Sequence, residues 1–396
     1  MAGAWGCRFV DRDKGCTVGP RVLVDATAVP ADRGGVGRYI DGLVPALAAA
    51  GGDIAVACQR ADADRLARLA PTARILSAPT TISHREDRLA WEQAGLPRLA
   101  EEIGADIIHC PQYSMPSQTS VPVVVTIHDA SMFSDPDIHA DERGDFIRSA
   151  TRYSMEHAIR FIVPSRATRD ELVRMLGFDA AKVDVAYHGI DTTVFRPPDD
   201  LERERVARRL GLHGQSYVGS LGEMSRRKNI PELIRGWVEA VTDMPHPPAL
   251  VLAGPATGDP LIRDAVAAVP SHLKLIRPGF LRPADLPGFM GGATIMAFPS
   301  RSEGFGFPTL EAMACGAAVL IARRLSLPEI GGQAAAYTEP EADSIARNLT
   351  RLLNDPDRRQ ALSEAAHARS QLFTWTASAQ IHLETYSRAA SAVAKQ

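Results

Sequence analysis

The chain has 396 residues, of which 45% are hydrophobic and 23% are charged. This composition is typical of a folded globular protein and excludes one that is mainly disordered, and the length suffices for about two domains. The 44 basic and 47 acidic residues give a net charge of −3. No overall positive field therefore exists to hold nucleic acid, and duplex binding would need a local basic stripe.

The cysteines and the N-terminal segment indicate the cellular setting. The five cysteines are scattered and never spaced as C-x-x-C, which argues against a disulfide framework or a structural zinc site and favours a reducing, cytoplasmic compartment. Charges at positions 11–14 interrupt the first segment, so we expect no signal peptide and interpret residues 1–19 as a loose leader. The longest apolar run, 121–127, is too short to span a membrane, whereas attachment to the inner membrane face stays open.

The first half of the chain alternates between two hydrophobic patterns. Strands are predicted at 21–29, 53–59, 106–110, 121–129, 161–165 and 183–189, and helices at 39–50, 61–70, 85–103, 141–158 and 167–176. Strands that alternate with helices indicate βαβ units and a parallel sheet. The apolar run at 121–127 suits a central strand of that sheet.

The second half repeats this alternation after a break. Residues 190–200 contain two prolines and three aspartates and are interpreted as a linker. The charge run 201–209 is interpreted as a solvated helix face. Strands follow at 216–222, 249–254, 274–279, 294–300 and 317–322, and helices at 231–242, 260–268, 283–291, 307–315 and 341–354. The sequence thus predicts an α/β protein with two facing, doubly wound domains and a ligand site in the cleft between them.

The segment 299–320 carries the densest chemical signal. A loop, Glu303-Gly304-Phe305-Gly306, follows a predicted strand, and Pro308 stands where a helix would begin. Glycines at a helix N-terminus leave N–H groups free for an anion. Glu303 before the helix and Glu311 inside it could both point toward one ligand, and carboxylates that accept hydrogen bonds from a vicinal diol suit a sugar or a ribose. The alternative for Glu311 is an ordinary solvated helix position.

The same segment, EGFGFPTLEAMACG, resembles the signature of the retaining family-four glycosyltransferases of the GT-B fold, which use nucleotide sugars. Other segments follow the family pattern too: Val163–Ser165, Tyr187–Asp191, Arg227–Asn229, Gly279–Leu281 and Leu327–Ile330. The resemblance implies an N-terminal Rossmann-like acceptor domain at 20–192 and a C-terminal donor domain at 200–372. It also implies a C-terminal helix within 373–396 that packs back on the first domain, with Trp375 as an anchor.

The resemblance assigns roles in the second domain. Glu303 would contact the sugar hydroxyls and Glu311 the ribose, while Lys228 and Arg227 would neutralise the diphosphate leaving group. Without that context the Arg226–Lys228 run is more typical of a solvated turn. The backbone at Gly304, Phe305, Gly306 and Phe307 would line the donor. Many members have an arginine after Gly219, where this chain has Ser220, which leaves the phosphate geometry open.

The resemblance also assigns roles in the first domain and to the base. Gly35 and Gly37 lie in a glycine turn that resembles the family loop that closes over the donor, although glycine turns between a strand and a helix are common in many proteins. His128 matches the active-site histidine that hydrogen-bonds the transferred sugar or developing charge; a lone histidine there is usually structural. Phe280 would face the nucleobase, or it would be an aromatic side chain packed at the end of a strand. Candidate acceptor contacts are Arg38, Tyr39, His109 and Gln112.

The sequence therefore predicts a retaining hexosyltransferase, with GDP-mannose favoured as donor, UDP-sugars next, and a glycan, lipid-linked or small-molecule hydroxyl as acceptor. No cofactor and no essential metal are expected, because the D-P-D triplets at 135–137 and 355–357 lie in apparent turns. The rival interpretations are a non-catalytic nucleotide-sugar-binding subunit and a GT-B phosphorylase or hydrolase. A dehydrogenase is disfavoured because G-x-G-x-x-G is missing from the first turn.

Overall fold

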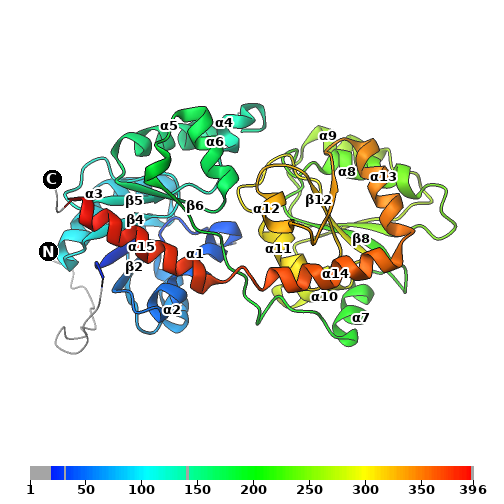
Figure 1. Ribbon diagram of the computed structural model, residues 1–396, viewed down its shortest axis with the longest axis horizontal. Helices are drawn as coiled ribbons and strands as arrows, with labels where there is room; N and C mark the ends of the chain where they lie inside the picture. The colour runs from blue at the N-terminus through cyan, green and yellow to red at the C-terminus, as the bar shows by residue number, and fades with distance from the viewer. Residues whose placement is uncertain (1–18, 31–32, 140–141, 394–396) are drawn as a thin grey trace.

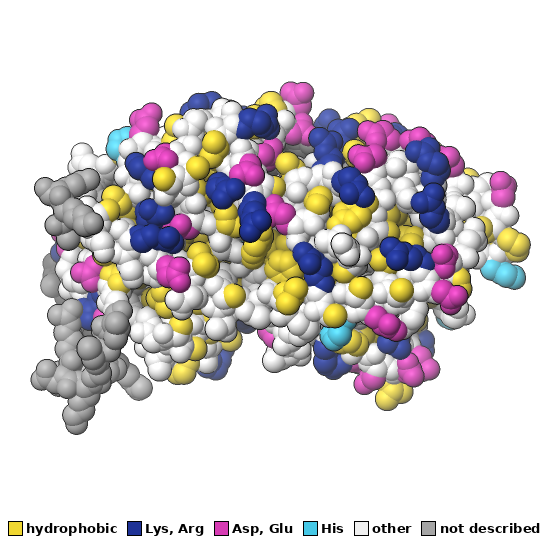
Figure 2. Space-filling view, in the orientation of Figure 1, with side chains coloured by type: hydrophobic (Ala, Val, Ile, Leu, Met, Phe, Trp, Pro, Cys, Tyr) yellow, Lys and Arg dark blue, Asp and Glu magenta, His cyan; other side chains and the backbone are white. Residues whose placement is uncertain are grey.

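The protein consists of two α/β halves that lie side by side (Figure 1). The computed structural model describes residues 19–30, 33–139 and 142–393; most of the predicted leader, 1–19, lies outside these ranges. Basic and acidic side chains are interspersed over the face shown in Figure 2, in keeping with the small net charge. Within the described ranges, no helix has the length and apolar character needed to cross a membrane.

The first half is built on a parallel sheet in the order β3-β2-β1-β4-β5-β6-β7. Its strands are β1 (Val22–Asp25), β2 (Ile54–Cys58), β3 (Arg74–Ser77), β4 (Ile107–Cys110), β5 (Val123–Thr126), β6 (Arg160–Val163) and β7 (Val183–Val185). The strand order reverses between β1 and β4, and ligands of open parallel sheets bind beyond the carboxyl ends of the strands at such a point. β5 is shorter than the predicted strand 121–129, so His128 lies in the loop after it.

Helices cover both faces of this sheet (Figure 1). They are α1 (Gly34–Ala49), α2 (Arg60–Leu69), α3 (Arg85–Ile103), α4 (Ser131–Ser134), α5 (Glu142–His157) and α6 (Arg166–Leu176), with the 3₁₀ turns η1 (Thr80–Ser83), η2 (Pro136–His139) and η3 (Ala180–Lys182). Ser165 caps α6 because its side chain accepts a hydrogen bond from the N–H of Thr168. The carboxyl ends of the strands thereby lead into helix starts that face the second half.

The second half is built on a parallel sheet in the order β10-β9-β8-β11-β12-β13. Its strands are β8 (Tyr217–Leu221), β9 (Ala249–Ala253), β10 (Leu275–Gly279), β11 (Ile295–Phe298), β12 (Val319–Ala322) and β13 (Ala336–Thr338). Its helices are α7 (Asp200–Arg209), α8 (Ile230–Val241), α9 (Pro260–Ala267), α10 (Leu286–Gly291) after η4 (Pro283–Asp285), α11 (Phe307–Ala314), α12 (Leu327–Gly331), α13 (Ala342–Leu353) and α14 (Pro356–Ser370). The two parallel sheets confirm the predicted fold class.

Several elements escaped the sequence patterns. These are the edge strands β3 and β13, the short helices α4 and α12, and the long helix α14. The triplet 355–357 is the start of α14 and not a turn: the Asp355 side chain accepts a hydrogen bond from the N–H of Arg358 at 2.8 Å, and Pro356 takes the first helical position, where a missing N–H costs nothing. The run 201–209 is α7, as predicted, and begins with a capping box between Asp199 and Glu202.

The last helix, α15 (Trp375–Val393), returns to the first half and lies along α1 (Figure 1). Gly42 of α1 makes this packing possible, since a Cβ there would lie 2.0 Å from the Trp375 ring. The chain thus crosses between the halves twice, and the crossings are joined by the N–H of Ile190, which donates to the carbonyl of Phe373 at 3.0 Å.

Candidate active site

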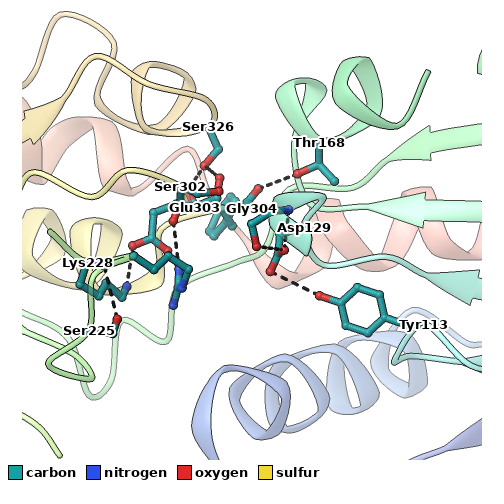
Figure 3. Close-up of polar contacts among 12 residues, drawn as sticks. Tyr113, Asp129, Thr168, Ser225, Lys228, Ser302, Glu303, Gly304 and Ser326 are labelled. Carbon is teal, nitrogen blue, oxygen red and sulfur yellow. Dashed lines mark hydrogen bonds and ion pairs between the residues drawn. The ribbon is translucent and has the colours of Figure 1, made fainter. Parts of the chain in front are cut away.

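The centre of the site is the Glu303 carboxylate, which two cations hold. Lys228 Nζ lies 2.5 Å from its Oε1, and Arg227 Nη1 lies 3.0 Å from its Oε2. Arg227 Nη1 also donates to the Ser302 carbonyl at 3.0 Å. Figure 3 shows Lys228 beside Ser225 and turned toward Glu303. The loop between β8 and α8 and the loop before α11 therefore meet at one ion-pair cluster.

This cluster is electrostatically coupled and largely shielded from water. Burial opposes the charged form of Glu303, but the charges of Lys228 and Arg227 outweigh it and lower the pKa of that carboxyl to about 2. Burial lowers the pKa of Lys228, whereas the Glu303 charge raises the pKa of Arg227 against its burial. At neutral pH Glu303 is an anion between two cations, so the cluster has an excess positive charge suited to a diphosphate.

The loop before α11 is held in a defined shape. Gly306 has φ 108°, which favours glycine, and it stands at the N-cap of α11 without a side-chain cap. Ser326 Oγ lies 2.7 Å from the Glu303 carbonyl and 2.9 Å from the Phe305 carbonyl. Figure 3 shows Ser326 beside the loop that carries Glu303 and Gly304. The start of α11 thus presents backbone N–H groups next to the cations.

Glu311 lies one turn inside α11 and pairs with a residue from the other half. Arg38 Nη1 lies 2.7 Å from Glu311 Oε1 and 2.9 Å from Oε2. The Glu311 side chain is only 1% exposed, and burial raises the pKa of its carboxyl although Arg38 opposes this. The predicted ribose contact is therefore a buried carboxylate and not a solvated helix position.

Gly304 lies at a close contact between the halves. Its carbonyl accepts hydrogen bonds from Ser165 Oγ at 2.7 Å and Thr168 Oγ1 at 3.2 Å. A Cβ at this position would lie 1.8 Å from the His128 carbonyl oxygen, so only glycine fits. Figure 3 shows Gly304 between Glu303 on one side and Thr168 and Asp129 on the other.

His128 stands beside this contact as a neutral imidazole. Its Nε2 lies 2.7 Å from the Pro111 carbonyl, which can only accept, so Nε2 carries the proton and Nδ1 is left as an acceptor. Burial lowers the pKa of His128 despite this hydrogen bond. The Tyr39 ring packs edge-on against it, with centroids 5.2 Å apart. The ring orientation is thereby fixed from two sides.

Two candidate acceptor residues lie inside the first half instead of on a surface. Tyr39 and His109 are both 0% exposed. The Tyr39 hydroxyl lies 2.7 Å from His382 Nε2, and His109 Nδ1 lies 2.8 Å from the Tyr386 hydroxyl. Both belong to a network that ties α15 to the sheet, so neither offers a free polar atom to an acceptor in this structure.

The remaining predicted residues differ in their exposure to solvent. Gly35 is exposed at the start of α1, Gly37 is buried in that helix and Gln112 is half-buried after β4. Phe305 is buried, and the half-buried Phe307 stacks on the His188 ring, 4.8 Å away. Phe280 is 70% exposed beyond β10. Ser220 is buried within β8 and lines the same small cavity as Lys228.

The sequence patterns did not predict the contact between the halves that Glu329 makes. Glu329, at the start of α12, accepts hydrogen bonds from the N–H groups of Arg166 and Ala167 at 3.0 and 2.7 Å, and from the Tyr187 hydroxyl at 2.8 Å. A carboxylate at the N-terminus of α6 is favoured by the helix dipole. The sequence segments 163–165 and 327–330 both stood out, but no local pattern shows that they meet.

Comparison with known proteins decides the family. Residues 33–194 match the family model described as Glycosyltransferase Family 4, and residues 202–369 match the model described as Glycosyl transferases group 1. The chain belongs to the family-four glycosyltransferases. The resemblance seen in the EGFGFPTLEAMACG segment is thereby confirmed, and this glycosyltransferase takes its sugar from a nucleotide sugar.

Two curated relatives and one solved structure illustrate the match. O-antigen chain mannosyltransferase B of Escherichia coli is 28% identical over 273 residues, which are 68% of this chain and 71% of the relative. D-inositol 3-phosphate glycosyltransferase of Corynebacterium kroppenstedtii is 28% identical over 383 residues, 88% of this chain and 84% of the relative. Sucrose-phosphate synthase from Thermosynechococcus elongatus has a TM-score of 0.73 at 20% identity, covering 94% of this chain and 100% of its own, and shows the GT-B fold.

Gly304→Ala is expected to reduce the turnover of the glycosyltransferase at least about tenfold while nucleotide affinity changes little, because the added methyl pushes the halves apart without touching the cation cluster. Steady-state kinetics and calorimetric titration with a nucleoside diphosphate check this. Gly19→Ala, at a glycine with open space around it, is the control. Unchanged turnover in Gly304→Ala would show that the close contact is not needed for reaction.

Glu329→Gln is expected to make the ligand-free protein more extended and to lower turnover a few-fold. The amide nitrogen cannot accept a hydrogen bond, so one N–H of α6 loses its partner and the helix dipole loses its countercharge. Small-angle scattering and kinetics check this. Asp343→Asn removes an exposed carboxylate of α13 that pairs only locally with Arg347, and should change neither quantity.

Proposed function

We propose that this glycosyltransferase moves a hexose, with mannose favoured, from a nucleoside diphosphate sugar to a hydroxyl of a glycan or lipid-linked acceptor with retention of the anomeric configuration. Two relatives support mannose: O-antigen chain mannosyltransferase B, and serotype-specific mannosyltransferase WbdA of Escherichia coli, which is 34% identical over 176 residues but matched over only 22% of its length. Anabaena Alr3699/HepE, solved with UDP and glucose, has a TM-score of 0.72 at 20% identity, which keeps UDP-sugars as the second candidate donors.

The observation that carries the proposal is the convergence of Lys228 and Arg227 on Glu303 at the start of α11. When a donor binds, its diphosphate would take the two cations, and Glu303 would accept hydrogen bonds from sugar hydroxyls in their place. The N–H groups at the start of α11 add fixed positive dipoles. Such pre-arranged charge favours the departure of a nucleoside diphosphate, since negative charge grows on the leaving oxygen.

The proposed retention requires no protein nucleophile. In a front-face substitution the acceptor oxygen forms its bond to the anomeric carbon while the bond from that carbon to the phosphate oxygen breaks. The leaving phosphate oxygen then takes the proton of the acceptor hydroxyl. The residues contribute by orientation and charge: His128 Nδ1 accepts a hydrogen bond from the sugar, and contact between the halves at Gly304 excludes water.

Metal independence is part of the proposal, because Lys228, Arg227 and the α11 N-terminus supply the charge that a divalent ion would otherwise supply. Activity that is unchanged in EDTA would support this, and loss that Mg²⁺ or Mn²⁺ restores would contradict it. A cytoplasmic setting is proposed from the buried, unpaired thiols of Cys58, Cys110 and Cys315. A lipid-linked acceptor would bring the enzyme to the inner membrane face.

The test is a thermal-shift screen against GDP-, UDP-, ADP- and TDP-sugars, followed by transfer assays with the donor that raises the midpoint most. We expect acceptor-dependent release of the nucleoside diphosphate and a product with the anomeric configuration of the donor by NMR. Free sugar released equally with and without acceptor would establish a hydrolase instead. Binding without any turnover would favour the non-catalytic subunit, and a product that forms only with inorganic phosphate would favour a phosphorylase.

A further inference from the structure

Arg38 links the two halves through a residue of the donor half. It lies in α1, directly after the glycine turn 34–37, and its Nη1 contacts both carboxylate oxygens of Glu311 in α11. The Arg38 side chain is 37% exposed whereas that of Glu311 is 1% exposed. A partly free cation from one half therefore reaches a buried anion of the other.

Glu311 has no partner in its own half. Over residues 19–30, 33–139 and 142–393, no group of the second half hydrogen-bonds to the Glu311 carboxylate. A buried carboxylate without hydrogen bonds is strongly unfavourable. Within the described residues of the second half, the Glu311 carboxylate therefore lacks a hydrogen-bond donor. Two kinds of group from outside that half can donate to it: a guanidinium or a vicinal diol.

Arg38 also lies within electrostatic reach of the cation cluster. Its charge contributes to lowering the pKa of Lys228, and the charge of Lys228 in turn acts on the pKa of Glu311. Three cations, Arg38, Arg227 and Lys228, therefore surround two carboxylates. Once released from Glu311, the Arg38 guanidinium would lie next to the cluster that is proposed to hold the diphosphate. Guanidinium groups bind phosphate oxygens in a forked geometry.

We propose that Arg38 is a donor-binding residue with two alternating partners: Glu311, as in this structure, and the donor diphosphate once the ribose diol has taken Glu311. This rests on the proposed function and deepens it. The ion pair of Arg38 with Glu311 competes with the ribose, and the diphosphate compensates by giving Arg38 a new anion. A nucleoside without phosphates must displace Arg38 with no such compensation, so we expect it to bind poorly. The intact donor instead binds Arg38 through its diphosphate and thereby brings α1 toward itself.

The test is calorimetric titration of uridine, UDP, guanosine and GDP into the full chain and into Arg38→Gln. In the variant, affinity for the nucleoside of the preferred base is expected to rise about tenfold, because its competitor is gone, and affinity for the diphosphate to fall about tenfold. Arg38→Lys should restore most of the diphosphate affinity, and weakening of that affinity by salt should be smaller in Arg38→Gln than in the wild type.

Arg65→Gln is the matched control. Arg65 is a similarly exposed arginine of the same half that pairs with Asp41, outside the contact between the halves, and its loss should alter neither affinity. A fall of both affinities in Arg38→Gln, no change in either, or no detectable nucleoside binding to that variant would overturn the proposal. A wild-type protein that binds no nucleotide at all would instead refute the proposed function.

Discussion

Lys228→Ala is expected to lower the turnover of sugar transfer by about 10²–10³-fold. The Lys228 ammonium lies beside the Glu303 carboxylate with only 11% of its side chain exposed. A pre-arranged cation in such a shielded site stabilises leaving-group charge by this order of magnitude. Arg227→Ala should have a similar but smaller effect, because Arg227 is more exposed, 26% against 11%. Turnover and the affinity for a nucleoside diphosphate are measured for each variant.

Arg226→Ala provides the matched control from the same turn. Arg226 precedes the two cations in sequence, but it is 51% exposed and pairs with Asp259, at 2.7 Å, instead of Glu303. Its replacement should leave turnover within about twofold, as expected for an exposed ion pair. Equal losses in Arg226→Ala and Lys228→Ala would indicate that the whole basic turn acts nonspecifically and that Lys228 has no distinct role.

The arrangement of Glu303 and Glu311 in the second half was predictable because these residues are close in sequence. Glu303, the two glycines after it and Glu311 belong to one loop and the helix that follows, so their spacing fixes their placement at the start of α11. Lys228 and Arg227 come from the loop after the neighbouring strand β8. Parallel strands bring such loops to one edge of the sheet, but the roles of Lys228 and Arg227 were predicted from the family resemblance, since the basic turn alone resembles a solvated one.

The candidate residues of the first half were less predictable because a strand has two faces. His109 lies within β4, and the sequence does not show which covering element its side chain meets. In the structure α15 returns from the far end of the chain, and its Tyr386 and His382 engage His109 and Tyr39. The hydrogen bond between His109 and Tyr386 joins residues that are 277 positions apart in the sequence. No local sequence pattern predicts this contact. The buried position of His109 therefore could not be distinguished, from the sequence, from a position that contacts an acceptor.

Contacts between the halves were the hardest to predict. The pair of Arg38 and Glu311 and the contact of Gly304 with Ser165 depend on how closely the two halves approach. Hydrophobic periodicity specifies each half separately and carries no information on their separation. Arg38 was named as a candidate acceptor contact, whereas in the structure its guanidinium pairs with Glu311 of the second half.

Glu303→Gln is expected to lower the free energy of unfolding by about 3 kcal/mol at pH 7 and by less than half of that at pH 3. The pKa of Glu303 is about 2 in the folded protein, below its ordinary value of 4.5. Ionised Glu303 therefore stabilises the fold fully above pH 4.5, and this contribution disappears as the pH falls from 4.5 to 2. Urea unfolding of wild type and variant between pH 7 and pH 3 measures the difference.

Glu311→Gln should show the opposite dependence on pH. Burial raises the pKa of Glu311, so its ionisation costs stability once the pH rises above the unfolded-state value, and the glutamine variant gains relative to wild type as the pH increases. Both substitutions remove one carboxylate of similar burial, and only the surrounding charges differ. Two parallel pH profiles would mean that Lys228 and Arg227 do not hold Glu303 ionised, and the cation cluster would lose its physical basis.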